Sequence, residues 1–279
     1  MTQMMDVAPQ SSGAPKLVSI VVPVYWNEAS LPILFGELLA QEKLLSERGC
    51  SLQLVFVDDG SGDRSLEVLL SLKSQRPDLV TVVKLARNFG AIHSSKVGIN
   101  YVKGDCFLWL AADLQDPPYL VSQMVDRWLA GSKYVLAART TRDDPASTRL
   151  SSAIYYWLVR LFVIPEYPRG GFDIILMDKS IYHYIRDSSK NINTSLLSYW
   201  LGFKPAVIEY ERPAREHGQS RWTFGKRLTY FIDSILGFSI VPIRAISVVG
   251  MITAVLGFIY GTYIFVSALF GQTDAPGFA

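Results

Sequence analysis

The stretch LVSIVVPVY, residues 17–25, is apolar throughout apart from Ser19. Such runs are typical of a parallel sheet whose strands are covered by helices on both faces. Four similar runs follow along the chain, and apolar residues between them recur at spacings of three and four, which is the period of a helix. We therefore predict an open, doubly wound α/β sheet. The later runs are LQLVFVDD (52–59), LVTVVKLA (79–86), CFLWLAAD (106–113) and KYVLAART (133–140), and the helical patterns cover 30–47, 63–75, 93–103 and 117–130.

The five runs end in polar sequence. In an open parallel sheet, ligands bind beyond the carboxyl ends of the strands, because these ends meet at one edge. The polar residues of the first half should therefore gather at a single rim. The strand ends concerned read PVYWNE, VDDGSGD, LARNFG, AADLQD and ARTTR.

Composition excludes several classes of protein. The 279 residues have room for one large α/β domain with an appendage or for two small domains, and a net charge of +2 argues against nucleic acid as a partner. Two cysteines without CxxC spacing are too few for a disulfide framework and fit a reducing compartment. The three histidines are scattered and do not have the spacing of zinc ligands.

The second half of the chain has a different character. An apolar helix is predicted over 150–165, a loop and a further strand over 170–182, and a strand running into a basic loop over 204–222. The amphipathic segment 224–244 carries basic residues at its start. We interpret it as one or two helices lying in a membrane interface, with an ordinary surface helix as the alternative.

The 26 residues 245–270 contain no charged side chain. At about 1.5 Å per residue, this segment is longer than the ~30 Å hydrocarbon core of a bilayer, so we predict a transmembrane helix. Basic residues precede the span, namely Lys226, Arg227 and Arg244, and only Asp274 follows it. By the positive-inside rule, the N-terminal domain lies in the cytoplasm.

The predicted rim is rich in carboxylates. It has neither GxGxxG nor a P-loop, which disfavours a dinucleotide site and an ordinary ATPase. Carboxylates repel a bare phosphate, so their concentration at a ligand-binding rim is explained by a divalent cation lying between them and a diphosphate. Three arginines at strand ends could bind phosphate oxygens directly: Arg87, Arg139 and Arg142. The rim carboxylates are Glu28, Asp58, Asp59, Asp63, Asp113 and Asp116.

Six motifs in order, VVPVYWNE, VDDGSGDRS, RNFG, ADLQDPP, GGFD and REHGQSRW, resemble the inverting glycosyltransferases of family two. The similarity is to the polyprenyl-phosphate transferases related to dolichyl-phosphate mannose synthase and bactoprenol glucosyltransferase, and it spans residues 17–244. It implies the GT-A fold and a cytoplasmic catalytic domain at the inner membrane. The implied reaction moves a sugar from a nucleotide diphosphate, with a UDP-sugar favoured, to a polyprenyl phosphate, assisted by Mg²⁺ or Mn²⁺.

The resemblance also implies roles for the donor-binding residues. Pro23, Tyr25 and Glu28 would lie along the nucleobase, and Asp58 or Asp59 would hydrogen-bond the base or the ribose. A turn with helix caps is the alternative for the two aspartates.

Other matching positions concern the phosphates. Asp113 and Gln115 correspond to the metal and diphosphate ligands of a DxDxQ pattern, while Arg139 and Arg142 would meet phosphate. Asp116 is assigned instead to capping the following helix, with Pro117 in its first turn.

Asp173 of GGFD would be the active-site carboxylate near the acceptor, with a structural loop residue as the alternative. Arg215, Ser220 and Arg221 would belong to a loop that closes on the nucleotide and the lipid phosphate. A solvated surface, or one that contacts anionic lipid, is the alternative for the two arginines.

The chain departs from the family pattern at two positions. Trp26 separates Tyr25 from the Asn-Glu pair of a motif that often reads YNE, which leaves the nucleotide preference open. Ala111 replaces the first aspartate of DxD, so we expect a weaker or differently completed metal site. Two rival functions therefore stay open: a catalytically silent sugar-nucleotide-binding scaffold, and a transferase that extends a polysaccharide.

These inferences divide the chain into five segments. Assembly into a homo-oligomer is left open. The segments are a disordered tail (1–16), the catalytic domain (17–222), juxtamembrane helices (223–244), the transmembrane helix (245–270) and an extracytoplasmic tail or truncated end (271–279).

Overall fold

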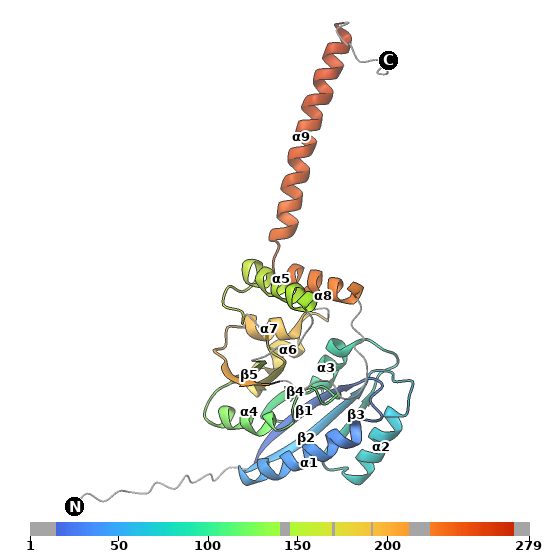
Figure 1. Ribbon diagram of the computed structural model, residues 1–279, viewed down its shortest axis with the longest axis vertical. Helices are drawn as coiled ribbons and strands as arrows, with labels where there is room; N and C mark the ends of the chain where they lie inside the picture. The colour runs from blue at the N-terminus through green and yellow to red at the C-terminus, as the bar shows by residue number, and fades with distance from the viewer. Residues whose placement is uncertain (1–14, 140–145, 169–170, 191, 212–223, 271–279) are drawn as a thin grey trace, which may run out of the picture.

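A computed structural model describes residues 15–139, 146–168, 171–190, 192–211 and 224–270. Within these residues the strands form one seven-stranded sheet in the order β3-β2-β1-β4-β6-β5-β7 (Figure 1). The five strands expected in the first half are all present. The strands are β1 (Lys16–Val24), β2 (Cys50–Asp58), β3 (Val80–Lys84), β4 (Cys106–Trp109), β5 (Tyr134–Arg139), β6 (Ile174–Asp178) and β7 (Ala206–Tyr210).

Strand β6 is the one strand of this sheet that runs against the others. It pairs antiparallel with both β4 and β5, whereas the β1–β2, β1–β4, β2–β3 and β5–β7 pairs are parallel. The carboxyl ends of the six other strands therefore meet at the edge where β6 begins. This direction decides which loops can form a common site.

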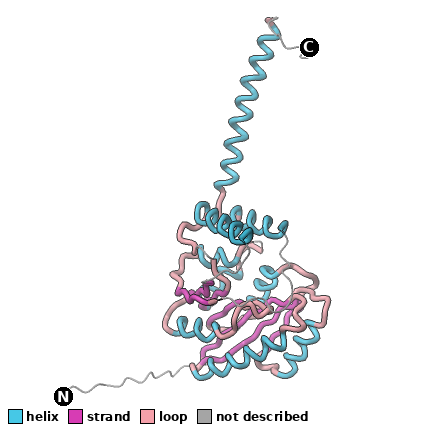
Figure 2. The backbone as a smooth tube through the Cα atoms, viewed as in Figure 1, coloured by secondary structure: helices cyan, strands magenta, loops and turns pink. Residues whose placement is uncertain are grey.

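Helices cover both faces of the sheet, as the alternating pattern predicted. Core contacts place α1, α2 and α4 on one face and α3, α6 and α7 on the other (Figures 1 and 2). The described helices are α1 (Leu31–Glu47), α2 (Ser65–Gln75), α3 (Ala91–Ile99), α4 (Leu120–Leu129), α5 (Ala146–Phe162), the 3₁₀ turn η1 (Lys179–Ile181), α6 (Tyr182–Arg186), α7 (Thr194–Trp200), α8 (Phe224–Leu236) and α9 (Val241–Leu269).

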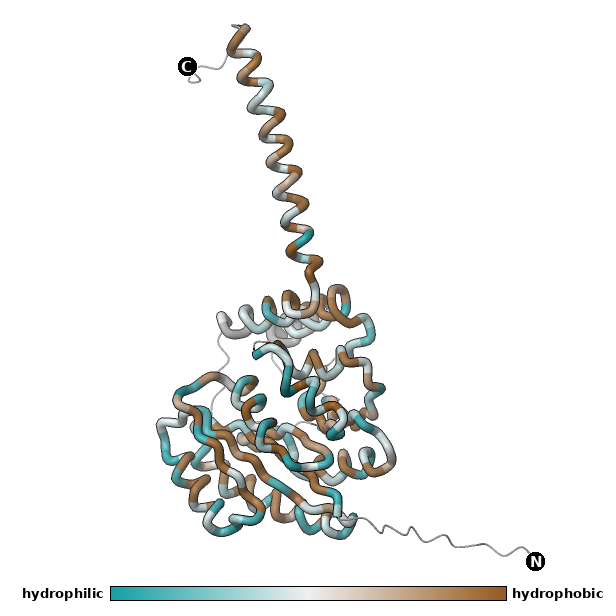
Figure 3. Tube along the Cα trace, turned by 180° about the vertical axis from the view of Figure 1, so that it is seen from behind, coloured by the Kyte–Doolittle hydropathy of each residue, from teal (hydrophilic) through white to brown (hydrophobic). Residues whose placement is uncertain are grey.

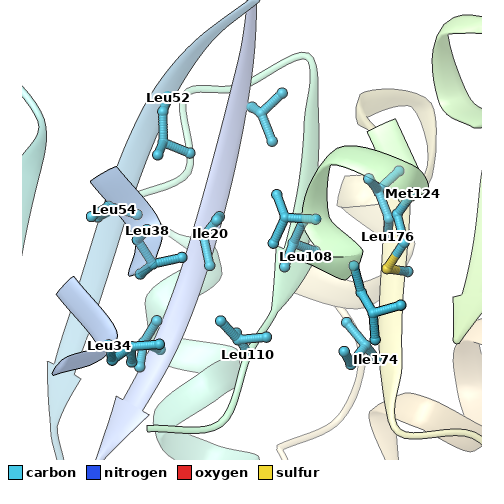
Figure 4. Close-up of a cluster of buried hydrophobic side chains, with 14 of the residues drawn as sticks. Ile20, Leu34, Leu38, Leu52, Leu54, Leu108, Leu110, Met124, Ile174 and Leu176 are labelled. Atoms are coloured by element: carbon cyan, nitrogen blue, oxygen red, sulfur yellow. The ribbon is translucent and has the colours of Figure 1, made fainter. Parts of the chain in front are cut away.

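The larger core cluster lies between the sheet and helices α1 and α4 (Figure 4). Side chains on alternate positions of β1 point to this face, and Ile20 among them is fully buried. Leu34 and Leu38 of α1 and Leu108 of β4 pack against it, each with no exposed surface. Burial of this apolar surface holds the sheet and helices together.

Helix α9 extends away from the domain, with α5 and α8 lying side by side near its foot (Figures 1 and 2). Its 29 residues are long and apolar enough to cross a membrane, with a mean hydropathy of 1.9, and none of its most apolar window is buried. In Figure 3 most of the α9 tube has the brown of hydrophobic residues. The length and composition of α9 agree with the predicted span.

Some boundaries differ from the predicted ones. Strand β4 ends at Trp109, so residues 111–113 lie in the turn beyond it, where parallel pairing with β1 has already stopped. Helix α9 starts at Val241 with a proline in its first turn, and therefore includes Arg244, which we had assigned to the preceding segment. Only α8 and the start of α9 occupy the described part of the predicted juxtamembrane segment.

Replacing Leu108 by alanine tests the importance of the central core. Leu108 is fully buried, so Leu108→Ala should lower the free energy of unfolding by about 2–5 kcal/mol through lost transfer energy and a residual cavity. Leu70→Ala is the matched control, because Leu70 is 52% exposed. Thermal unfolding of both variants in detergent measures the difference, and equal midpoints would contradict this account of the core.

Candidate active site

The candidate site is the edge of the sheet where the parallel strands end. β1 ends at Val24, β2 at Asp58, β5 at Arg139 and β7 at Tyr210, while β6 begins at Ile174. The register keeps these ends level: Val24 is paired with Asp58, and Arg139 with Tyr210. We call this edge the rim. It contains the described members of the predicted site.

The corner between β1 and β2 is built around Asp58. Its side chain is buried, and Oδ1 accepts a hydrogen bond from the Ser61 amide at 3.2 Å, as in an Asx turn. Oδ2 is also buried and has no hydrogen-bond partner among the described residues. A buried carboxylate oxygen without a donor is costly, so this atom is suited to receive an N–H or O–H group of a ligand.

Asp59 has a different task from its neighbour. Its two carboxylate oxygens accept hydrogen bonds from the amides of Phe89 and Gly90, both at 2.8 Å, and so tie the end of β2 to the loop before α3. Burial raises the pKa of this carboxyl, the two amide donors oppose the rise, and the charge of Asp58 adds to it. Asp59 therefore shapes the rim, with both oxygens already engaged by the protein.

Gly60 permits a close approach of two loops. Its φ is +68°, and a Cβ here would lie 2.6 Å from the carbonyl carbon of Arg87. Any larger residue would push Arg87 away. The Arg87 side chain is exposed and its guanidinium lies 4.1 Å from the centre of the Phe89 ring, which leaves it accessible to an anion.

Two non-glycine residues in the described part of the chain have positive φ, and both lie at the rim: Trp26 at 60° and Leu114 at 61°. For such side chains this conformation is an outlier that costs about 1–2 kcal/mol. The Trp26 amide donates to the Ser61 hydroxyl at 3.1 Å, and its ring packs against Gly62 and the edge of Tyr25. Strain of this kind is concentrated at functional sites.

Glu28 links β1 to the start of α2. Its Oε2 accepts from the Arg64 amide at 2.9 Å, and its own amide donates to Asp63 at 3.4 Å. Pro23 occupies the penultimate position of β1. The half-buried Tyr25 is the first residue after this strand, and its amide donates a hydrogen bond to the Asn27 side chain. These residues form one wall of the rim.

The turn after β4 carries Asp113 and Gln115. The positive φ of Leu114 turns the chain sharply, and Asp113 Oδ1 accepts from the Gln115 amide at 3.3 Å. Ser30 secures the turn by donating to the carbonyl of Ala112 at 2.7 Å. Both Asp113 and Gln115 keep partly exposed surface.

The capping assignment for Asp116 is wrong. Helix α4 begins at Leu120 with Tyr119 as its N-cap residue, because Pro117 and Pro118 form the turn before it. Asp116 is buried beside that turn.

An ion pair crosses the other end of the rim. Arg139 Nε lies 2.6 Å from Asp173 Oδ2, and the Tyr210 hydroxyl donates to the same oxygen at 2.9 Å. Asp173 reaches this place because β6 begins where β5 ends, and its amide donates to the carbonyl of Ala137. Burial lowers the pKa of Arg139, but the charge of Asp173 and the hydrogen bond outweigh this effect and raise it overall.

The fold thus brings together at one edge most residues predicted for the site. Tyr210 was missed, although it ends a parallel strand and the rule that ligands bind at strand ends applied to it. Ser61 was also missed as a partner of Trp26, for which the sequence offers no signal. Four predicted residues lie outside the described part of the chain: Arg142, Arg215, Ser220 and Arg221.

The rim carboxylates do not form a complete metal site by themselves. In the described residues, no group of three or more His, Cys, Asp or Glu side chains could hold a metal ion. Asp113 and Gln115 supply oxygen ligands of the kind that Mg²⁺ prefers, and Mg²⁺ commonly takes one or two carboxylates together with substrate phosphates and water. The residues present therefore fit an ion that a bound diphosphate helps to hold.

Comparison with known proteins bears on this site. A profile of the family described as "Glycosyl transferase family 2" matches residues 19–189. The uncharacterized glycosyltransferase YkcC of Bacillus subtilis is 31% identical over 94% of this chain and 80% of its own length. The bactoprenol glucosyl transferase of Shigella phage SfX is 28% identical over 94% and 85%. The undecaprenyl-phosphate 4-deoxy-4-formamido-L-arabinose transferase of Photorhabdus laumondii is 29% identical over 91% and 78%.

Solved structures share the fold. Glucosyl-3-phosphoglycerate synthase from Mycobacterium tuberculosis superposes with a TM-score of 0.54, covering 78% of this chain and 76% of that one at 15% identity. Mannosyl-3-phosphoglycerate synthase from Rubrobacter xylanophilus gives 0.53, with 78% and 71% covered at 18% identity. Likeness at this level concerns the fold alone, and it confirms the predicted GT-A architecture.

Removing the carboxylate of Asp173 should cost more stability than removing that of Asp126. Both make ion pairs with a 2.6 Å contact to an arginine Nε, but Arg139 and Asp173 are 21% and 12% exposed, against 29% and 50% for Arg48 and Asp126. Asp173→Ala leaves a mostly buried guanidinium without its partner, which costs about 3 kcal/mol. Asp126→Ala should cost about 0–1 kcal/mol. Thermal unfolding measures both, and equal losses would show that the rim pair is no more important than a surface pair.

Proposed function

The chain belongs to glycosyl transferase family 2, and on that premise we propose that it transfers a sugar from a nucleotide diphosphate to a polyprenyl phosphate at a membrane. The observation that carries the proposal is the combination of the rim with α9. The rim offers carboxylates and cations at the ends of parallel strands, and α9 is a candidate membrane span joined to the same domain. The names of two relatives, a bactoprenol glucosyl transferase and an undecaprenyl-phosphate transferase, support a lipid acceptor.

The nucleotide occupies the corner between β1 and β2 in this proposal. The partnerless Oδ2 of Asp58 accepts a hydrogen bond from the base or ribose. Trp26 and Tyr25 supply aromatic surface beside it, and exposed Arg87 is placed for a phosphate. A UDP-sugar is the proposed donor.

Asp113 and Gln115 would hold a divalent cation, Mg²⁺ or Mn²⁺, together with the diphosphate. Such an ion stabilises negative charge on the departing diphosphate. Ala111 leaves one family ligand out, so the affinity for the ion depends on the donor being bound. This coupling follows from the small number of protein ligands at the turn after β4.

The acceptor phosphate would approach Arg139. Asp173 and Tyr210 hold this guanidinium in place through the 2.6 Å contact and the hydrogen bond to Oδ2, so its position is fixed before substrate binds. A phosphate oxygen attacks the anomeric carbon of the sugar while the bond to the diphosphate breaks on the opposite side, which inverts the anomeric configuration. The acceptor is already anionic near neutral pH, so Asp173 is proposed to orient Arg139 and not to remove a proton.

The membrane arrangement supports a lipid acceptor over a soluble one. A polyprenyl phosphate cannot leave the bilayer surface, and a domain attached through α9 stays beside it. We propose the cytoplasmic side of the plasma membrane, with residues 17–222 as the catalytic domain. Assembly into a homo-oligomer stays a prediction that no contact of the described residues supports.

The decisive experiment supplies both substrates. Membranes containing the protein are incubated with Mg²⁺, undecaprenyl phosphate and a panel of radiolabelled UDP- and GDP-sugars, and label extracted into chloroform is counted. We expect lipid-linked product with a UDP-sugar. Its absence with every donor, from a folded preparation that binds sugar nucleotide by calorimetry, would favour the silent scaffold that Ala111 suggests. Product elongation on a polysaccharide primer instead would favour the polymerising alternative.

Two substitutions test the metal site. Ala111→Asp adds the missing carboxylate, so the Mg²⁺ concentration for half-maximal transfer should fall about tenfold. Asp113→Asn should lower kcat/KM about 10²-fold or more by weakening charge stabilisation. Asp126→Asn, on the exposed ion pair with Arg48, is the control and should change neither quantity. An unchanged Mg²⁺ dependence in both test variants would remove these residues from the metal site.

A further inference from the structure

A cavity of about 600 Å³ lies at the C-terminal end of α5. It is lined by Trp157, Arg160 and Leu161 of α5 and by residues 165–168 of the following loop. None of these residues belongs to the nucleotide or acceptor site described above. The cavity therefore requires a separate explanation.

Arg160 gives the cavity a positive charge that no carboxylate of the described residues neutralises in an ion pair. Its Nη1 atom is buried and has no hydrogen-bond partner, and the guanidinium forms no salt bridge within the described residues. Arg48, Arg76, Arg139 and Arg186, by contrast, each contact a carboxylate within 2.8 Å. A buried, unsatisfied cationic donor is costly, and an anion held against the part of the Arg160 side chain that lines the cavity would offset its charge.

Glu166 adds the opposite charge to the same cavity. Its side chain is exposed and it makes no salt bridge with Arg160, although both residues line the cavity. The backbone carbonyl of Glu166 accepts from the Tyr199 hydroxyl at 3.1 Å, which anchors the loop. Two opposite charges that do not neutralise each other are complementary to a ligand that carries both an anion and a cation.

The position of α5 indicates where this ligand comes from. The 29 residues of α9 span about 43 Å at ~1.5 Å per residue, which exceeds the ~30 Å hydrocarbon core. Arg244 in the first turn of α9 marks the polar interface, since a charged side chain at helix ends reaches toward head groups. Helix α5 lies at the foot of α9, next to α8, and so at the depth of the lipid head groups (Figures 1 and 2).

The exposed face of α5 fits this depth. Trp157 and Leu161 are each 56% exposed and Ile154 is 49% exposed, at the helical spacing that places them on one side. Tryptophan is enriched where membrane and water meet. Lipid chains that cover Ile154 and Leu161 would bring their head groups to Arg160.

We propose that this cavity binds the head group of a zwitterionic phospholipid, with the phosphate on Arg160 and the amine beside Glu166 and the Trp157 ring. The occupant is a phosphate diester carrying a primary amine, as in phosphatidylethanolamine. The inference rests on the proposed membrane anchoring by α9 and is independent of the transferase reaction. Its role is to fix the depth and tilt of the domain on the bilayer, so that the rim stays within reach of a lipid phosphate.

Native mass spectrometry of the full chain released from detergent micelles tests the proposal. With equal amounts of phosphatidylethanolamine and phosphatidylglycerol added, the ethanolamine lipid should be retained preferentially. Arg160→Gln should lower its occupancy about tenfold, the effect of losing a charge-assisted hydrogen bond. Glu166→Gln should abolish the preference between the two lipids while binding persists. Arg127→Gln, which removes a charge from the exposed surface of α4, is the matched control and should change nothing.

Several results would overturn the proposal. Unchanged retention in Arg160→Gln, with far-UV circular dichroism and thermal unfolding equal to those of the parent chain, excludes a head group on this side chain. Equal retention of both lipids by the parent chain excludes the zwitterionic assignment. Displacement of the lipid by millimolar inorganic phosphate would indicate a site for free phosphate. Because lipid retention is measured without sugar transfer, a failure here is distinct from a failure of the transferase assay.

Discussion

The insertion of β6 between β4 and β5, against the direction of every other described strand of the sheet, is the constraint on which the site depends. A parallel strand in this place would begin at the opposite edge and carry Asp173 away from the rim. The reversed strand begins where β5 ends, so Asp173 meets Arg139 across adjacent strands. Strand β7, parallel to β5, then adds Tyr210 to the same carboxylate.

Conformational strain at the other end of the rim arises from the parallel strands. The parallel strands β1 and β2 must release their chains into loops at one edge, and these loops crowd each other. Gly60 lies against the backbone of Arg87. Trp26, whose ring packs against Gly62, adopts a positive φ, and Leu114 also adopts a positive φ in the turn after β4. Hydrogen bonds that the Ser61 hydroxyl and the Asp59 carboxylate accept, and one that the Ser30 hydroxyl donates, hold the crowded turns. Strain fixed in this way by the surrounding packing gives a preorganised site, at a cost to stability that the buried core offsets.

The membrane side of the molecule follows from the order of its last helices. Helix α8 returns the chain from the catalytic domain to α5, and α9 departs from that layer. In the proposed arrangement, the head-group site on α5 and the site for a lipid phosphate at Arg139 belong to one domain beside the same bilayer. In this arrangement, the same contacts with lipid set how deeply the domain sits on the bilayer and whether the acceptor lipid can reach Arg139.

The sequence by itself determined the alternation of strands and helices, the apolar span near the C-terminus and the likeness to a transferase family. These are local properties: continuous apolar runs, helical periodicity and residues in fixed order carry their meaning without distant partners. It also placed Asp58, Asp113 and Arg139 at strand ends, because that inference needs only the parallel direction. The assignment of Asp116 as a helix cap failed, since two prolines moved the start of α4 to Leu120. Only the tertiary structure decided the reversal of β6, the pairing of Asp173 with Arg139 and Tyr210, and the placing of Arg160 without an ion-pair partner among the described residues. Each depends on which segments distant in sequence lie side by side, and that is set by packing of the whole chain.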